Sequence, residues 1–395
     1  MIYSNFYIEV NCAQKNYGEE RICGDVFLSR RISEEGRTIV VLSDGMGHGV
    51  KANVLATLTA TMAQNFTLEH KEPEKIAEII MNTLPVCSER QMSYSTFTII
   101  DIQENGVVSI LEYDNPETFI LRGKKIFDPQ WNYLVLQTEK NVGKEIRTCS
   151  FLPRKEDRIF ICSDGITQSG LGTQQYPFGW GLDKLKEYIL KQITSNPDLS
   201  ARRISGKVVN MANKIDGYFS RDDTSCATIY FRNPRKLLVC TGPPYDEAKD
   251  IELAESVKNF DGKKIISGAT TADIIGRELN IPIEDSINFD DPDLPPISFM
   301  EGIDLVTEGI LTLTKVTRIL KDYSSSYPLG KGPADKIVSL FRESDNIRFI
   351  IGTRINIAHQ DPSLPVDLEI RRTVVKRMGK ILEEKFLKTV SIEYI

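Results

Sequence analysis

The segment from residue 40 to residue 49 reads Val40-Val41-Leu42-Ser43-Asp44-Gly45-Met46-Gly47-His48-Gly49. An apolar run ends in an acid, and three glycines follow it within five residues. Beyond them, apolar residues recur every four positions from Val50 to Phe66, which predicts a helix with these residues on its apolar face. We therefore expect a buried strand that delivers Asp44 to a tight turn. Glycine at such a turn lets the backbone come close to a ligand.

Other acids stand at similar positions along the chain. Ser163-Asp164-Gly165 follows the apolar run Ile159 to Cys162, Asp25 precedes a strand-like run, and Asp222-Asp223 precede another. A single Asp-Gly is most often an ordinary turn, and Asp44 alone could also cap a helix. If these strand ends lie side by side, however, three or four carboxylates crowd one edge, and their pKa values rise unless cations neutralise them. Ligation by oxygen alone suits Mg²⁺ or Mn²⁺.

In order along the chain, these motifs resemble the metal-dependent phosphatases of the protein phosphatase 2C superfamily, and within it the bacterial SpoIIE-type branch. The motifs are Cys23-Gly24-Asp25, Ser43-Asp44-Gly45-Met46-Gly47-His48-Gly49, Ser163-Asp164-Gly165 and Asp222-Asp223-Thr224-Ser225, with support from Tyr94-Ser95-Thr96 and Asn115-Pro116. The resemblance covers residues 1–232. It implies an α+β fold, an αββα sandwich of two antiparallel sheets with two metal ions at one end.

The resemblance also implies roles for individual residues. By motif position, Asp44 bridges both metal ions, and Gly45 offers its carbonyl oxygen to one of them. Asp164 and Asp222 complete the other site, so that Asp44, Asp164 and Asp222 form the catalytic set. The implied cofactors are two divalent cations, Mn²⁺ or Mg²⁺. Two bridged cations lower the pKa of a shared water, and the resulting hydroxide attacks phosphorus.

For the other candidate residues, more than one interpretation is open. The resemblance implies that Asp25 serves the first metal, directly or through water, and that Asp223 supports the site. His48 is either a general acid or a structural imidazole, and we favour the structural interpretation. Lys15 or Arg21 would hold the phosphate, although a solvated charge is the slightly favoured interpretation of each.

The implied activity is that of a serine/threonine protein phosphatase. Its substrate would be a small phosphorylated regulatory protein, such as an anti-sigma-factor antagonist. One alternative is a pseudophosphatase that acts as a signalling scaffold. An active site that had lost its function would lose a carboxylate first, however, and all four acids of the motifs are present. Another alternative is a ligand-binding regulator centred on the C-terminal half.

The C-terminal half, residues 233–395, has a different pattern. Strand-like and helix-like segments alternate, which predicts an α/β domain with a partly parallel sheet. One of the expected helices spans residues 306–321. We recognise no family for this half, and we expect it to sense a ligand, to form a homodimer or to select the substrate.

One turn in this half has two interpretations. Strand 264–266 is followed by small residues and then by a helix over residues 271–279. Thr270 and Asp273 fit a capping box, which accounts for the residues without any ligand. The alternative is a small anionic ligand at Gly268–Thr271, because a helix N-terminus can bind an anion.

Composition restricts the class of protein. A chain of 395 residues favours two domains, and its net charge of −6 argues against a nucleic-acid partner. No apolar run approaches the roughly 20 residues that span a bilayer, and the N-terminus lacks a signal peptide's pattern. Seven scattered cysteines, none in a C-x-x-C pair, suggest reduced thiols. We therefore expect a cytoplasmic protein with no membrane partner.

Overall fold

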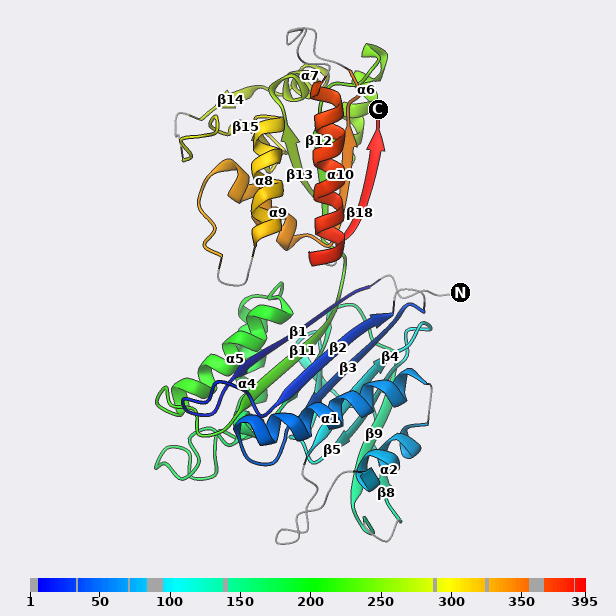
Figure 1. The fold of residues 1–395 in the computed structure, drawn as a ribbon, viewed down its shortest axis with the longest axis vertical. Coiled ribbons are helices and arrows are strands. Elements are labelled where there is room, and N and C mark those ends of the chain that lie inside the picture. Colours follow the sequence, from blue (N-terminus) through cyan, green and yellow to red (C-terminus); the bar gives the residue numbers. More distant parts are fainter. Residues whose placement is uncertain are drawn as a thin grey trace. The chain divides into compact units, whose positions relative to one another are not determined.

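The structure is a computed structural model that describes residues 6–32, 35–69, 72–83, 95–137, 141–286, 290–323, 327–354, 366–386 and 388–395. The chain divides into two compact units, Met1–Asn233 and Pro234–Ile395, and Figure 1 shows the elements of each. Tyr94 of the Tyr94-Ser95-Thr96 motif and Cys87, one of the seven cysteines, lie outside the described residues.

Two antiparallel sheets form the centre of the N-terminal unit. The six-stranded sheet has the order β2 (Val26–Ile32), β3 (Arg37–Ser43), β4 (Phe97–Ile102), β5 (Val108–Tyr113), β9 (Glu145–Phe151) and β8 (Asn132–Val135). The five-stranded sheet has the order β1 (Tyr7–Lys15), β11 (Thr224–Arg232), β10 (Asp157–Cys162), β6 (Phe119–Arg122) and β7 (Lys125–Phe127). Strands buried on both faces explain the continuous apolar runs in β3 and β10.

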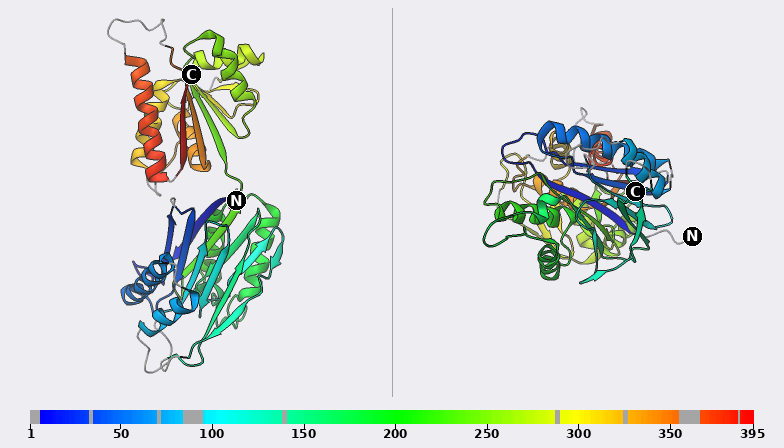
Figure 2. Two further views of the ribbon diagram at one scale, coloured as in Figure 1. Left: turned by 90° about the vertical axis from the view of Figure 1, so that its right-hand side faces the viewer. Right: turned by 90° about the horizontal axis from the view of Figure 1, so that it is seen from below.

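Helices cover the outer face of each sheet (Figure 2). Helices α1 (Gly49–Leu68) and α2 (Pro73–Thr83) pack on the six-stranded sheet, and α4 (Leu182–Ser195) and α5 (Ala201–Ile215) pack on the five-stranded sheet. A third apolar core lies between the sheets. The predicted αββα sandwich of two antiparallel sheets is therefore confirmed.

The predicted apolar face of α1 is wrong. Val50 and Val54 are each 60% exposed, whereas the helix buries small residues such as Ala56 and Ala60 against the sheet. A repeat of four residues drifts by about 40° per step around a helix of 3.6 residues per turn. The apolar stripe therefore begins on the solvent side at Val50 and reaches the core only at Met62 and Phe66.

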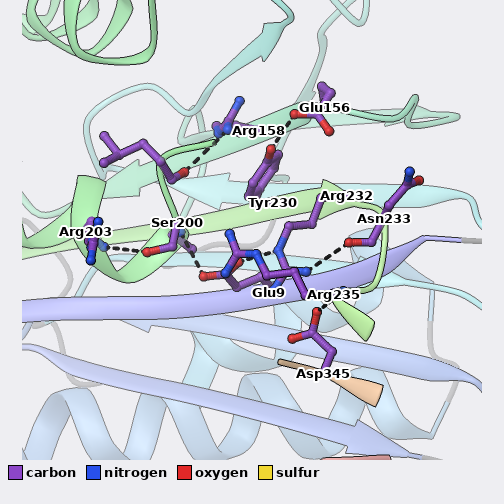
Figure 3. A network of polar contacts seen from close by, with 12 residues as sticks. Glu9, Glu156, Arg158, Ser200, Arg203, Tyr230, Arg232, Asn233, Arg235 and Asp345 are labelled. Atoms are coloured by element: carbon purple, nitrogen blue, oxygen red, sulfur yellow. Dashed lines mark hydrogen bonds and ion pairs between the residues drawn. The ribbon is translucent and has the colours of Figure 1, made fainter. Parts of the chain in front are cut away.

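Glu9 of β1 fixes the start of α5 (Figure 3). Its Oε1 accepts a hydrogen bond from the Ala201 backbone N–H at 3.0 Å, and its Oε2 accepts one from Arg232 Nε at 2.6 Å. Ser200 caps the helix by accepting a hydrogen bond from the Arg203 N–H at 3.2 Å. Unpaired N–H groups of the first helical turn are thus satisfied by side chains.

The C-terminal unit has a seven-stranded sheet of mixed parallel and antiparallel strands, which confirms the predicted partly parallel sheet. Its order is β14 (Ile283–Asp285), β15 (Ser298–Met300), β16 (Leu305–Thr307), β13 (Lys263–Ser267), β12 (Lys236–Thr241), β17 (Asn346–Ile351) and β18 (Thr389–Tyr394). The strands from β16 to β18 are parallel, and β14 and β15 are antiparallel. One face is covered by α8 (Ile310–Asp322), α9 (Pro333–Glu343) and α10 (Val366–Phe386). The other face is covered by α6 (Asp250–Lys258), which directly follows the short helix η1 (Glu247–Lys249), and by α7 (Ala269–Leu279).

Two local predictions for this unit are wrong. The helix expected over residues 306–321 begins at Ile310, because Leu305–Thr307 form strand β16 beside β13. The capping box is absent, because Gly268 is the N-cap residue of α7 and no side chain caps the helix. Thr270 lies inside the first turn instead of ahead of it. Pairing with a neighbouring strand decided the first case, and local propensity could not reveal it.

Two findings concern the environment of the protein. No helix in the described ranges is long and apolar enough to cross a membrane. The six cysteines within these ranges are free thiols, and four of them are buried. These four behave as small core residues.

Two substitutions test the orientation of α1. Val54→Gln should change the free energy of unfolding by less than about 0.5 kcal/mol, because this side chain is exposed. Ala60→Leu should destabilise the protein by about 1–3 kcal/mol, because added methylenes overpack the interface with the sheet. Chemical denaturation measures both. A larger loss for Val54→Gln than for Ala60→Leu would contradict the orientation.

Candidate active site

Two acidic residues meet at one end of the six-stranded sheet. Val26, the first residue of β2, pairs with Ser43, the last residue of β3. Asp25 and Asp44 extend these two strands by one residue each, so they lie on neighbouring strands at the same edge. The structure therefore brings these carboxylates together.

The other acids meet at one end of the five-stranded sheet. Cys162 ends β10 and pairs with Cys226 near the start of β11. Asp164 is the first residue of α3 (Asp164–Thr167), and Asp222 lies just ahead of β11. Burial raises the pKa of Asp222 to about 6, and the charge of Asp164 adds to the shift. These two carboxylates are therefore electrostatic neighbours.

Asp25 joins the two sheets. Its Oδ2 accepts a hydrogen bond from Ser225 Oγ on β11 at 2.5 Å, while its Oδ1 is buried with no hydrogen-bond partner. Burial raises the pKa of Asp25 to about 7 despite hydrogen bonds from Ser225 and Ser163, and the charges of Asp223 and Asp222 raise it further. The acids at the adjoining ends of β2, β3, β10 and β11 thus form one acidic cluster.

Asp44 interacts electrostatically with three other carboxylates of this cluster. Burial raises the pKa of Asp44 well above its usual range, and the carboxylates of Asp25, Asp164 and Asp222 raise it further. A side-chain hydrogen bond with Asp164 also favours the protonated form. Carboxylates this close cannot all ionise without a compensating positive charge. The cluster therefore requires protons or cations.

Backbone contacts hold the turn at Asp44. Its carbonyl oxygen accepts hydrogen bonds from the Thr96 N–H at 2.9 Å and from Ser95 Oγ at 2.8 Å. Gly45 forms a β-bridge with Ser95, and a Cβ atom at Gly45 would lie only 2.0 Å from the carbonyl oxygen of Ala52. Glycine is thus required by the approach of α1, a contact within the chain that the sequence did not suggest.

His48 has a structural position at this site. It is the N-cap residue of α1, so Asp44 does not cap that helix. Its ring stacks on Tyr17 with centroids 4.3 Å apart, and its Nδ1 lies 3.3 Å from Glu20 Oε1. His48 also lies near enough to Asp222 to lower the pKa of that carboxyl group. Sequence reasoning missed Tyr17 and Glu20, because no motif marks them.

The two basic residues considered for phosphate binding are both exposed. Lys15 ends β1 opposite Thr224, close to the acidic residues that precede β11, and Arg21 lies in the loop between β1 and β2. Neither side chain makes a hydrogen bond or ion pair that holds it at the cluster in the described part of the chain. Their role as phosphate ligands stays a prediction.

The segment from Gly170 to Gly181 lies against α3. The Gly181 N–H donates to the Thr167 carbonyl oxygen at 2.8 Å, and Trp180 is buried in the core beneath α4. Phe178, by contrast, is 90% exposed. The segment is therefore anchored by one aromatic residue and presents another to solvent.

The donor set of the cluster fits hard divalent cations. Asp25 Oδ1 and Asp223 Oδ2 are both buried without a hydrogen-bond partner, and every side-chain donor is a carboxylate oxygen. Asp223 is oriented through its other oxygen, which accepts the Tyr17 N–H at 3.0 Å. Among the described residues, no three His, Cys, Asp or Glu side chains are already arranged to hold one ion.

Comparison with known proteins assigns the family. The family model described as Stage II sporulation protein E (SpoIIE) matches residues 34–232, which is half of the chain. The chain therefore belongs to the SpoIIE family, whose catalytic domain is of the PP2C phosphatase type. Asp44, Gly45, Asp164 and Asp222 lie inside the matched region, and Asp25 precedes it.

Three of the solved structures that are similar to this chain illustrate the likeness. The SpoIIE phosphatase domain from Bacillus subtilis has a TM-score of 0.44 at 14% identity, covering 59% of this chain and 95% of its own. The structure of RsbX in complex with magnesium has a TM-score of 0.39 at 17% sequence identity, and the match covers 57% of this chain and 95% of RsbX. The RsbU and RsbW domains of Rv1364c from Mycobacterium tuberculosis have a TM-score of 0.44 at 12% sequence identity, and the match covers 65% of this chain and 70% of that structure. No curated protein matched, so the assignment rests on the family model.

The raised pKa values predict how pH affects the metal-free protein. Asp25 and Asp222 keep protons in the folded state up to pH values of about 7 and about 6, whereas the unfolded chain loses them near 3.8. The contribution of these two groups to folding stability is therefore greatest at low pH and falls as the pH rises through this window. We expect the melting temperature in a chelator to decrease between about pH 4 and about pH 7.

Substitutions identify the groups responsible for this slope. Asp25→Asn should flatten the dependence, whereas Asp183→Asn, an exposed position at the start of α4, should leave it unchanged. A melting temperature that is constant or rises over this range in the wild type would contradict the electrostatic description of the cluster.

Proposed function

We propose that this chain is a metal-dependent serine/threonine protein phosphatase that hydrolyses phosphoserine or phosphothreonine on a small regulatory protein, with an anti-sigma-factor antagonist as the expected kind of substrate. The observation that carries the proposal is the acidic cluster, in which buried carboxylates from both sheets adjoin one another with two oxygens unpartnered. A fold that keeps such repulsion without function would be needlessly destabilised. We propose a cytoplasmic location for this activity.

The chain's own residues would prepare the site in distinct ways. Ser225 orients Asp25, Ser95 and Thr96 fix the backbone of Asp44, and the Tyr17 N–H orients Asp223. Two divalent cations, Mn²⁺ or Mg²⁺, would supply an activated water and neutralise charge on the phosphoryl oxygens. The residues that would hold them are Asp25, Asp44, the Gly45 carbonyl, Asp164 and Asp222, with Asp223 in support.

Enzyme kinetics tests the catalytic set. With Mn²⁺ present, Asp44→Ala and Asp222→Asn should each lower kcat/KM for p-nitrophenyl phosphate and for a phosphoserine peptide by roughly 100-fold or more, because each removes charge needed for cation binding. Asp183→Asn, at an exposed position, is the matched control and should keep wild-type activity.

The outcomes also separate the alternatives. Equal rates in the wild type and both site variants would contradict the binuclear mechanism. A wild type that is inactive and binds no cation would instead support the scaffold, or pseudophosphatase, interpretation.

We further propose that the C-terminal unit regulates this activity. The match to the family model ends at residue 232, before this unit begins. The parallel strands of its sheet have a carboxyl edge, which is where α/β sheets usually bind ligands. A small anionic ligand near Gly268–Thr271 is the proposed signal, and homodimer formation is the alternative role for this unit.

A further inference from the structure

Two helices begin side by side at the carboxyl edge of the C-terminal sheet. Strand β13 ends at Ser267 and β16 ends at Thr307, and these two residues pair in parallel register. Gly268 is the N-cap residue of α7, and Gly309 is the N-cap residue of α8. The positive ends of two helix dipoles therefore lie at neighbouring strand ends.

The two N-termini are held close together. The Gly268 N–H donates to the Thr307 carbonyl oxygen at 2.8 Å, and Ser267 Oγ donates to the Glu308 carbonyl oxygen at 2.9 Å. A Cβ atom on Gly309 would lie 3.5 Å from Gly268 Cα. With φ at +127°, Gly268 has a conformation that favours glycine. The backbone is thus built for close approach at this point.

Each helix carries a threonine hydroxyl without a partner. Thr271 and Thr312 are the third residues of α7 and α8, are 1% and 0% exposed, and have no hydrogen-bond partner for their Oγ1 atoms. Other helical threonines differ: Thr317 donates its hydroxyl to the carbonyl oxygen of Leu313, four residues earlier. Burial of an unpaired hydroxyl is unfavourable, so these two positions call for an acceptor.

The Thr271 hydroxyl points toward the paired N-termini. A Cβ atom on Gly268 would lie 3.3 Å from Thr271 Oγ1 and 3.9 Å from Gly309 Cα, which places this hydroxyl beside the gap between the two helices. Thr312 has the same spacing from its own N-cap glycine, and helical side chains lean toward the N-terminus. The segments Gly268–Thr271 and Gly309–Thr312 therefore have the same Gly-x-x-Thr pattern at the start of their helices.

A cationic side chain from α10 lies against the end of the neighbouring strand β12. Thr241, the last residue of β12, pairs with Ser267, so Gly242 lies next to Gly268 along the edge. A Cβ atom on Gly242 would be 2.5 Å from Nη1 of Arg371 on α10. Positive charge is thus present beside the two helix ends, as an anionic ligand would require.

We propose that the N-termini of α7 and α8 together bind the phosphate group of a small molecule. Thr271 and Thr312 would donate their hydroxyls to the phosphate oxygens, in addition to the free backbone N–H groups of both first turns. This site deepens the proposed regulatory role of the C-terminal unit, but its ligand binding does not require phosphatase activity.

Calorimetry and thermal unfolding of the full chain test the site. The probes are inorganic phosphate, ATP and, as a phosphate-free control, adenosine. Inorganic phosphate or ATP should bind and raise the melting temperature, while adenosine should not. Binding of phosphate alone identifies a free-phosphate site, and binding of ATP alone identifies a nucleotide site.

Substitutions assign the binding to the two hydroxyls. Thr271→Val and Thr312→Val should weaken binding by roughly ten- to a hundredfold, because each removes a hydrogen bond to a charged group. Without ligand, both variants should melt at or above the wild-type temperature, because no existing hydrogen bond is lost. Thr271→Ser keeps the hydroxyl and should keep binding. Thr317→Val, a buried threonine of α8 whose hydroxyl is already bonded, should bind like the wild type.

Three results would overturn the proposal. The first is that neither inorganic phosphate nor ATP binds the wild-type chain. The second is that both valine variants bind as tightly as the wild type. The third is that adenosine binds as well as ATP. A protein that fails as a phosphatase but binds phosphate would overturn the proposed activity and leave this site intact.

Discussion

Repulsion among buried carboxylates is the constraint on which the N-terminal unit depends. Two unit charges about 4 Å apart repel by about 4 kcal/mol near a protein surface, and several carboxylates here raise one another's pKa values. The αββα sandwich tolerates this because three apolar cores stabilise the strands that carry the acids. Binding of cations would convert the unfavourable cluster into a catalytic one, so the fold and the proposed activity depend on the same residues.

Close backbone contacts determine how the acids are presented. A Cβ atom at Gly45 would collide with the carbonyl oxygen of Ala52, and one at Gly165 would lie 2.2 Å from that of Asp223. Both Ser-Asp-Gly turns therefore need glycine for the same steric reason. The C-terminal unit uses glycine in a similar way, where Gly268 and Gly309 let two helix ends approach each other. In both units, small residues bring polar groups together at strand ends.

Much of the fold was predictable, because strand and turn patterns are local properties. The acids at strand ends followed from apolar runs next to Asp and Gly, and the partly parallel C-terminal sheet followed from alternating strand-like and helix-like segments. The αββα sandwich was implied by the family resemblance of the motifs and not by these local patterns. Tertiary contacts decided the rest. The buried face of α1 depends on which side chains fit against the sheet, and small alanines pack there instead of the predicted stripe that begins at Val50. The unpartnered hydroxyls of Thr271 and Thr312 depend on two helices that sequence analysis could not place side by side.

Titration calorimetry with Mn²⁺ tests the central claim most directly, because it reports on cation binding without any substrate. The wild-type chain should bind two Mn²⁺ ions, and Asp44→Asn should weaken binding by roughly tenfold or more, since the Asp44 carboxyl group is buried and interacts with Asp25, Asp164 and Asp222. Asp183→Asn should bind like the wild type. A wild-type chain that binds no Mn²⁺, or an Asp44→Asn variant that binds it equally well, would contradict the interpretation of the acidic cluster as a metal centre.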